Sequence, residues 1–182
     1  TVAGATSGSD GVLPTNGTPL TSQRLRTMID TFLLEQNFFN PPCIVAGGSD
    51  GGDCHELGSG ELFTEQPVII DIFPLDKSSM YNGDCTRTVV HGNVPDEIIR
   101  MHAAVAEAKQ SATSIIKAGV AGEEVHLETI RVLKKHGYVE GLPKENDPPT
   151  FCSMPHRTGH GIGLDHNADI RGVELRIDHR AI

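Results

Sequence analysis

The order of apolar and polar residues first predicts a strand–turn–strand unit between residues 68 and 90. An apolar run at 68–70 leads into Asp71, and a second β-branched run follows Asp84. The segment between them is rich in Pro, Asp, Ser, Asn and Gly, a composition typical of turns. Two β-rich runs around a turn predict a hairpin. Such a hairpin places the Asp71 carboxylate, near the end of one strand, beside the Asp84 carboxylate, near the start of the next.

Helical periodicity appears in three further segments. Thr21 or Ser22 is expected to cap a first helix, which Asn40-Pro41-Pro42 ends. A second helix is predicted from Pro95 to about Lys117 and a third over about 122–136. His102, His126 and His136 are expected to face solvent. The predicted inward faces are Leu25, Met28, Ile29, Phe32 and Leu33 in the first helix, Ile98, Met101, Val105, Ala108, Ala112, Ile115 and Ile116 in the second, and Val125, Leu127, Ile130 and Leu133 in the third.

Two shorter stretches complete the predicted layout. Residues 1–19 are rich in small and polar residues and are predicted to be a linker. Cys43 to Ala46 is predicted to be a short buried strand, and a glycine-rich loop follows it and ends at His55. This loop is not a phosphate-binding loop, because no G-K-[ST] follows and no helix is expected to begin there. The segment 169–180 contains no turn or cap that would close a domain.

Composition narrows the classes of function. The 182 residues suffice for one domain with a core, and the net charge of −9 disfavours a nucleic-acid partner. No apolar run approaches the ~20 residues needed to span a bilayer, so no membrane partner is expected. The four cysteines are scattered, which favours buried, reduced thiols and a cytoplasmic setting, although two disulfides stay open.

Two clusters of residues carry candidate chemistry. Carboxylates held a few ångströms apart repel each other unless a proton or a cation lies between them, so Asp71 and Asp84 are candidate metal ligands. Solvated turn aspartates are the competing interpretation. Far downstream, His156, His160 and His166 lie within eleven residues, interleaved with glycines. Histidine is a common metal ligand and acid–base group, and glycine permits close approach of backbone and ligand.

The order of these motifs carries a resemblance. A hairpin aspartate, then G-D-C-T-R-T at 83–88, two amphipathic helices and H-R-T-G-H-G-I-G-L at 156–164 together resemble the creatinase/aminopeptidase metallopeptidases, and within them the Xaa-Pro aminopeptidase and Xaa-Pro dipeptidase branch. The resemblance covers roughly residues 18–176. It implies an α+β pita-bread fold, a curved and mostly antiparallel sheet with helices on its outer face. Residues 20–182 are then expected to be a partial catalytic domain of this fold, with the last strands missing.

The resemblance also implies a set of site residues. The family holds two divalent ions, Mn, Co or Zn, with two aspartates, one histidine and two glutamates. Asp71 and Asp84 match the aspartates and His160 matches the histidine. His55 and His166 match histidines that stabilise the reaction intermediate, and His156 matches one near the substrate pocket. Peptides are the implied substrates, and a homodimer is compatible with the resemblance.

Three departures from the family pattern affect these expectations. Asp71 and Asp84 have twelve residues between them, more than the commonest spacing. The run from His160 to His166 is one residue short, and an odd deletion in a strand turns the following side chains to the other face. The Glu-Pro-Gly strand and the final R-x-E strand are absent, and Glu174 is not followed by Pro-Gly. With three of five ligands matched, single or reduced metal occupancy and little peptidase activity are expected.

The sequence therefore predicts a dinuclear-metal exopeptidase that hydrolyses the bond before proline, with impaired activity in this chain. One alternative is a non-catalytic peptide- or protein-binding homologue of the same fold. The presence of Asp71, Asp84 and His160 favours enzyme ancestry over that alternative. A methionine aminopeptidase is the other alternative, and the T-R-T-V at 86–89 and D-I-F-P at 71–74 favour the proline-directed branch.

Overall fold

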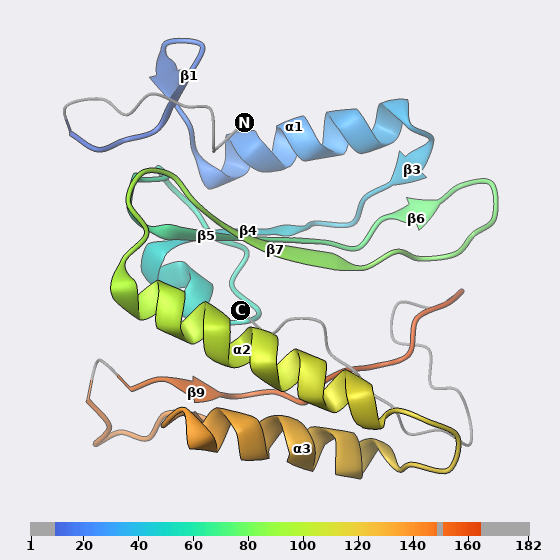
Figure 1. Ribbon diagram of the computed structural model, residues 1–182. Helices are drawn as coiled ribbons and strands as arrows, with labels where there is room; N and C mark the ends of the chain where they lie inside the picture. The colour runs from blue at the N-terminus through green and yellow to red at the C-terminus, as the bar shows by residue number, and fades with distance from the viewer. Residues whose placement is uncertain (1–9, 149–150, 165–182) are drawn as a thin grey trace. The chain divides into compact units, whose positions relative to one another are not determined.

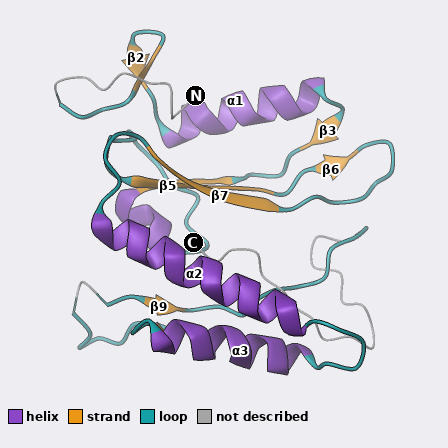
Figure 2. Ribbon diagram, viewed as in Figure 1, coloured by secondary structure: helices purple, strands orange, loops and turns teal. Residues whose placement is uncertain are grey.

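The computed structural model describes residues 10–148 and 151–164 of the 182-residue chain (Figure 1). The described chain falls into two compact units, one comprising residues 10–99 and 162–164, and the other residues 100–148 and 151–161. Helices and mostly antiparallel strands give the α+β composition that the sequence predicted (Figure 2).

The first unit is built on a three-stranded antiparallel sheet in the order β4–β5–β7. Its middle strand β5 pairs on both sides, so the predicted hairpin of residues 68–90 is confirmed as β5 and β7. The sheet strands are β4 Ile44–Gly47, β5 Pro67–Ile72 and β7 Cys85–Val90. Shorter strands pair separately in this unit, namely β1 Pro14–Thr15 with β2 Thr18–Pro19, and β3 Phe38–Phe39 with β6 Leu75–Asp76.

The register of this sheet separates its two faces. Val45 and Val68 belong to the apolar cluster of the unit, against which Ile70, Ile72 and Val89 also pack. Asp71 lies opposite Thr86 of β7 and Ile44 of β4. Because side chains alternate along a strand, Asp71 points to the face opposite that of Ile70 and Ile72. One face is therefore a packed core, and the other carries a carboxylate.

Helix α1 (Ser22–Glu35) covers the apolar face of the sheet (Figure 1). The hydroxyl of Thr21 accepts a hydrogen bond of 3.1 Å from the Arg24 amide, as expected for a helix cap. Leu25 and Leu33 are buried as predicted, but Met28 and Phe32 are 42% and 62% exposed. The buried face of α1 is therefore narrower than the five-residue face that the periodicity predicted, because a helix over a three-stranded sheet buries only the side that touches it.

Residues 1–19 were predicted to be a linker, but the part of this segment that the structure describes, residues 10–19, packs against the core of the first unit. Residues 10–19 form the β1–β2 turn, and Leu13, with Leu20 just beyond it, is fully or almost fully buried in the core of the first unit. The Leu13 amide donates to the Leu62 carbonyl, and the Leu62 amide donates to Leu20. Composition missed this because two leucines are enough to anchor a segment that is otherwise small and polar. The assignment of residues 20–182 to one catalytic domain remains a proposal.

The second unit contains the third α-helix of the chain and, from Arg100 on, the α-helix before it. Helix α2 (Asp96–Ile115) buries Ala104, Ala108 and Ala112, whose spacing makes one ridge of small side chains. Helix α3 (Gly122–Lys135) buries Val125, Ile130 and Leu133, but Leu127 is 57% exposed and the prediction that it faces inward was wrong. Two short strands, β8 Val139–Glu140 and β9 Ser153–Met154, pair in parallel beside them.

The described helices include none that combines the length and apolar composition required to cross a bilayer. The four cysteines all lie in the described part of the chain, and none of them is in a disulfide. Cys43 is buried, and this burial raises the pKa of its thiol. Cys54, Cys85 and Cys152 are partly exposed, so the expectation of buried thiols was correct only for Cys43.

The chain after β4 folds back onto that strand through Gly58. A 3₁₀ helix at Gly48–Gly52 comes first, although no helix was expected there. The Val45 amide then donates to the Leu57 carbonyl at 3.0 Å. Gly58 is buried with φ +77°, and a Cβ built on it would lie 2.0 Å from the Val45 carbonyl oxygen. No L side chain fits that space, so this turn requires glycine.

We expect Gly58→Ala to destabilise the protein far more than Gly60→Ala. Gly60 has a nearly identical φ of +74°, but nothing lies within 4 Å of a Cβ built on it. Gly60→Ala therefore carries the cost of a left-handed backbone, about 1–2 kcal/mol. Gly58→Ala adds the collision with β4, a further ~1–3 kcal/mol or more. Urea unfolding of both variants measures the difference, and equal losses would contradict the packing described for Gly58.

A charged network joins the two helices of the second unit. The Glu128 carboxylate of α3 accepts hydrogen bonds from Arg131 at 2.6 and 2.7 Å and from the Ser111 hydroxyl of α2. The Arg131 guanidinium, and then Ser111, lower the pKa of Glu128 from 4.5 to about 2. A carboxyl whose pKa is lower in the folded state stabilises the protein above its unfolded pKa. This contribution is complete above about pH 4.5 and is lost as the pH falls toward 2.

Glu128→Gln should therefore lower the thermal midpoint at pH 6 and should have progressively less effect as the pH is lowered. The amide cannot ionise, so the variant lacks the contribution that the wild-type protein loses between about pH 4.5 and 2. Thermal unfolding of both proteins at several pH values from 6 to 2 measures this convergence. A difference that is independent of pH would show that Glu128 acts through packing alone.

Candidate metal centre

Asp71 is the buried carboxylate of the sheet. It lies in the central strand β5 with 1% of its surface exposed. Thr86, directly opposite on β7, donates its hydroxyl to Asp71 Oδ1 at 2.7 Å. This hydrogen bond fixes the orientation of the carboxylate, as outer partners of a metal ligand commonly do. A carboxylate is costly to bury unless hydrogen bonds or a cation offset its lost hydration.

Asp84 lies on the same face of the sheet as Asp71. It lies immediately before β7 and two residues before Thr86, so the alternation of side chains directs it to the side that carries Asp71. Residues related in this diagonal way lie roughly 7–8 Å apart, within reach of side chains that converge. Both carboxylate oxygens of Asp84 are buried. The hairpin therefore presents two buried carboxylates on one face, as the sequence predicted.

The hairpin arm beyond the two aspartates is held by its own turn and by the glycine-rich segment that follows His160. Gly83 donates its amide to the Pro74 carbonyl at 2.7 Å. The backbone and side-chain amides of Asn82 both donate to the Gly163 carbonyl, at 2.8 and 3.1 Å. Gly163 lies three residues after His160, and Asn82 lies two residues before Asp84. This contact therefore joins the turn of the hairpin to the segment 162–164 within the first unit.

His160 and His156 lie in the second unit, on the loop after β9. Both rings are half-buried, and each places Nδ1 near a backbone carbonyl, that of Gly161 at 2.8 Å for His160 and that of Arg157 at 3.0 Å for His156. A carbonyl can only accept, so Nδ1 carries the hydrogen. In the neutral ring the lone pair is then on Nε2, and in His160 this atom is buried. That tautomer is the one in which a histidine can bind a metal through Nε2.

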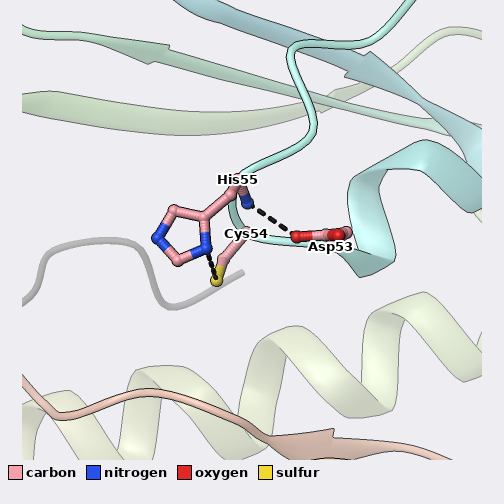
Figure 3. Close-up of side chains that lie close together, drawn as sticks. All are labelled: Asp53, Cys54 and His55. Carbon is pink, nitrogen blue, oxygen red and sulfur yellow. Dashed lines mark hydrogen bonds between the residues drawn. The ribbon is translucent and has the colours of Figure 1, made fainter.

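His55 lies on the exposed loop after the 3₁₀ helix, beside Asp53 and Cys54 (Figure 3). Its backbone amide donates to Asp53 Oδ1 at 2.8 Å, and its Nδ1 lies 3.5 Å from the Cys54 sulfur. One donor atom from each of these residues lies within 4.8 Å of the others. A sulfur, a nitrogen and an oxygen at such spacing are donors that borderline-soft ions such as zinc accept.

Within each unit, the structure brings some of the predicted residues together. Asp71 and Asp84 share a face of one sheet, whereas His160 and His156 lie on one loop of the other unit. His55 belongs to the first unit, on the loop fastened by Gly58. His166 and Glu174 lie outside the described residues. The roles of all these residues remain predictions of the sequence.

Sequence reasoning missed the residues that support the hairpin ligands. Thr86 donates a hydrogen bond to Asp71, but it was treated as an ordinary strand residue. Asn82 donates to the Gly163 carbonyl, but it was treated as an ordinary turn residue. The signal for Thr86 was available, because Asp84, Thr86 and Thr88 alternate and must share a face. Asn82 had no such signal, because its partner is 81 residues away in sequence.

Comparison with known proteins places the chain among peptidases. The sequence profile of metallopeptidase family M24 matches residues 14–177. Xaa-Pro aminopeptidase 3 of Dictyostelium discoideum is 26% identical over 68% of this chain and 24% of its own length. Xaa-Pro dipeptidase of Pyrococcus furiosus is 26% identical over 74% of this chain and 36% of its own length. The chain therefore spans about a quarter to a third of the length of these curated relatives.

A solved structure confirms the fold. Prolidase from Pyrococcus furiosus superposes with a TM-score of 0.67 at 23% identity, covering 80% of this chain and 40% of that one. At that identity the likeness concerns the fold alone. The α+β pita-bread fold that the resemblance implied is thereby confirmed.

Replacing Thr86 with Val should weaken the binding of Mn²⁺ about 10–100-fold, the usual cost of losing a partner that orients a ligand. Thr88→Val is the matched control. It removes a hydroxyl from the same face of the same strand, and the Thr88 Oγ1 is buried without a hydrogen-bond partner among the described residues. Titration of each variant with Mn²⁺, followed by electron paramagnetic resonance, measures both affinities. Equal affinities would show that the hydroxyl facing Asp71 does not orient a ligand.

Proposed function

Because the chain belongs to metallopeptidase family M24, we propose that it binds divalent cations through Asp71, Asp84 and His160 and hydrolyses the peptide bond before proline. The names of two relatives, an Xaa-Pro aminopeptidase and an Xaa-Pro dipeptidase, support the choice of substrate. The chain covers only part of each of them, so activity, substrate and site are all part of the proposal.

The donor atoms fit a divalent cation of intermediate hardness. Asp71 and Asp84 supply oxygen from one face of a sheet, and His160 supplies nitrogen in the tautomer whose Nε2 carries a lone pair. Mixed oxygen and nitrogen donors accept manganese, cobalt and zinc, so the donor set does not select one metal. The burial of both carboxylates also fits a cation, because a positive charge offsets their lost hydration.

The observation that carries the proposal is the contact between Asn82 and the Gly163 carbonyl. It joins a residue just before Asp84 to a residue just after His160, and both contacting residues belong to the first unit. Gly163 is three positions after His160, and Asn82 is two positions before Asp84. These short separations along the chain support the proposal that the two motifs serve one site.

Each residue then has a distinct task in the proposed reaction. Asp71 and Asp84 hold the cations, and Thr86 fixes the orientation of the Asp71 carboxylate. When bound, the cations activate water and polarise the scissile carbonyl. His55, exposed on its loop, is proposed to donate a hydrogen bond to the carbonyl oxygen as negative charge develops there, and His156 is proposed to bind the substrate. His166 is proposed for the same task as His55, as the sequence match indicates.

Two alternative functions differ from the proposed one in the peptides that the protein would cleave and in the effect of added Mn²⁺. A methionine aminopeptidase of the same fold would cleave Met-x peptides and not Xaa-Pro peptides. A binding homologue would retain peptide without cleaving it, whether or not Mn²⁺ is added. Incubation with a panel of Met-x, Xaa-Pro and longer x-Pro peptides, analysed by mass spectrometry, separates these functions. Preference for Met-x peptides would overturn the choice of substrate, and binding without cleavage would favour the homologue.

Asp71→Asn and Asp84→Asn should each reduce Mn²⁺ affinity at least 10-fold, because each removes an anionic ligand. Asp76→Asn is the matched control on the same hairpin. Hydrogen bonds from Ser79 and Ser78 lower the pKa of the exposed Asp76 carboxyl, which therefore stabilises the turn. Calorimetric titration measures affinity and stoichiometry for all four proteins. Loss of affinity in Asp76→Asn equal to that in Asp71→Asn would overturn the assigned site.

A further inference from the structure

His126 makes contacts that its place on α3 did not predict. It was expected to face solvent, but only 21% of its side chain is exposed, and both ring nitrogens lie within hydrogen-bond distance of other elements. Nδ1 lies 2.9 Å from the Thr158 hydroxyl, and Nε2 lies 3.2 Å from Glu140 Oε1. His102 and His136 are exposed as predicted. His126 is therefore a bridge between three elements: α3, β8 and the loop that carries His156 and His160.

The direction of each hydrogen bond follows from the partners. An ionised carboxylate can only accept, so the Nε2 of His126 carries a hydrogen and donates it to Glu140. In the neutral ring Nδ1 then has the lone pair, and the Thr158 hydroxyl donates to it. Glu140 thus fixes the tautomer of His126, and the tautomer makes Nδ1 an acceptor for Thr158. A carboxylate, an imidazole and a hydroxyl are connected in one chain.

Thr158 connects these hydrogen bonds to the loop that carries His156 and His160. Glu140 belongs to β8, which pairs with β9 in the register Glu140–Met154, so the loop begins from a fixed strand. Thr158 lies midway between His156 and His160 and is next to the buried Gly159. The hydroxyl of Thr158 is bonded to His126 of α3, and in the same loop the Nδ1 atoms of His156 and His160 lie near adjacent backbone carbonyls. The loop is thus fastened to α3 between its two histidines.

We propose that His126, oriented by Glu140, is a positioning residue: it holds Thr158 and thereby sets the orientation in which His160 meets its cation. This inference rests on the proposed function, because it concerns the metal ligand His160. It adds a support that neither the sequence motif nor the comparisons assign. Such outer contacts matter because a ligand held loosely must be ordered each time it binds metal.

The test uses the 182-residue chain with Thr158→Val, Thr158→Ser, His126→Ala and the double variant His126→Ala/Thr158→Val. Thr158→Val removes the donor with little change of shape, whereas Thr158→Ser keeps it. His136→Ala is the matched control, because it removes an exposed contact to Glu107 at 2.7 Å elsewhere on α3. Mn²⁺ affinity is measured by electron paramagnetic resonance. The ring ¹H–¹⁵N NMR signals of His160, assigned with His160→Gln, are recorded without metal.

We expect Thr158→Val and His126→Ala each to weaken Mn²⁺ affinity about 10–100-fold. The double variant should be no weaker than either single variant, because both remove one interaction. Thr158→Ser and His136→Ala should bind like the wild type, which a general loss of stability would not produce. In the metal-free protein, Thr158→Val should shift the His160 ring signals and Thr158→Ser should leave them in place.

The failures of the two proposals are distinguishable. Wild-type protein that binds no Mn²⁺ would overturn the proposed function, and the metal-free NMR comparison would then decide the positioning role alone. Wild-type binding that is unchanged in Thr158→Val would overturn the positioning role and leave the proposed function intact. Unchanged His160 signals in Thr158→Val, or additive losses in the double variant, would also overturn it.

Discussion

The antiparallel pairing of β5 with β7 is the constraint on which the candidate site depends. Its register sets Asp71 opposite Thr86, so a carboxylate at the centre of the sheet meets a hydroxyl rather than another apolar side chain. A slip of one residue would move every side chain of β7 to the other face. The apolar cluster under α1 opposes such a slip, because Val89 would leave the core and Thr88 would enter it. The packing of one face therefore fixes the chemistry of the other.

Fixed supports also surround the loops that carry the histidines. Gly58 allows the segment after His55 to lie against β4, where no other residue fits. Thr158 fastens the His156–His160 loop to α3, and Gly163 fastens the chain beyond it to Asn82. None of these three supports carries charge, and none is a candidate ligand. They contribute by removing conformational freedom that the ligands would otherwise lose on binding a cation.

Local patterns predicted the elements well, because each pattern reflects a constraint within a few residues. The Thr21 cap, the β5–β7 hairpin and the pairing of Asp71 with Asp84 on one face follow from capping, turn composition and alternation. Long-range contacts could not be predicted in this way. Leu13 packs into the core from a segment that was taken for a linker. Leu127 points outward because it is two positions after the buried Val125, and residues two apart do not share a face of a helix. His126 was assigned to solvent because helical spacing alone cannot reveal partners on β8 and on a distant loop.

Asp71, Asp84 and His160 are proposed to bind one cation centre. Electron spin-echo spectroscopy of bound Mn²⁺ tests this proposal directly, because a coordinated imidazole nitrogen modulates the echo. We expect nitrogen modulation in the wild-type protein and in His55→Gln, and its loss in His160→Gln. Modulation that persists in His160→Gln but disappears in His55→Gln would place the ion at Asp53, Cys54 and His55 instead, and would contradict this proposal.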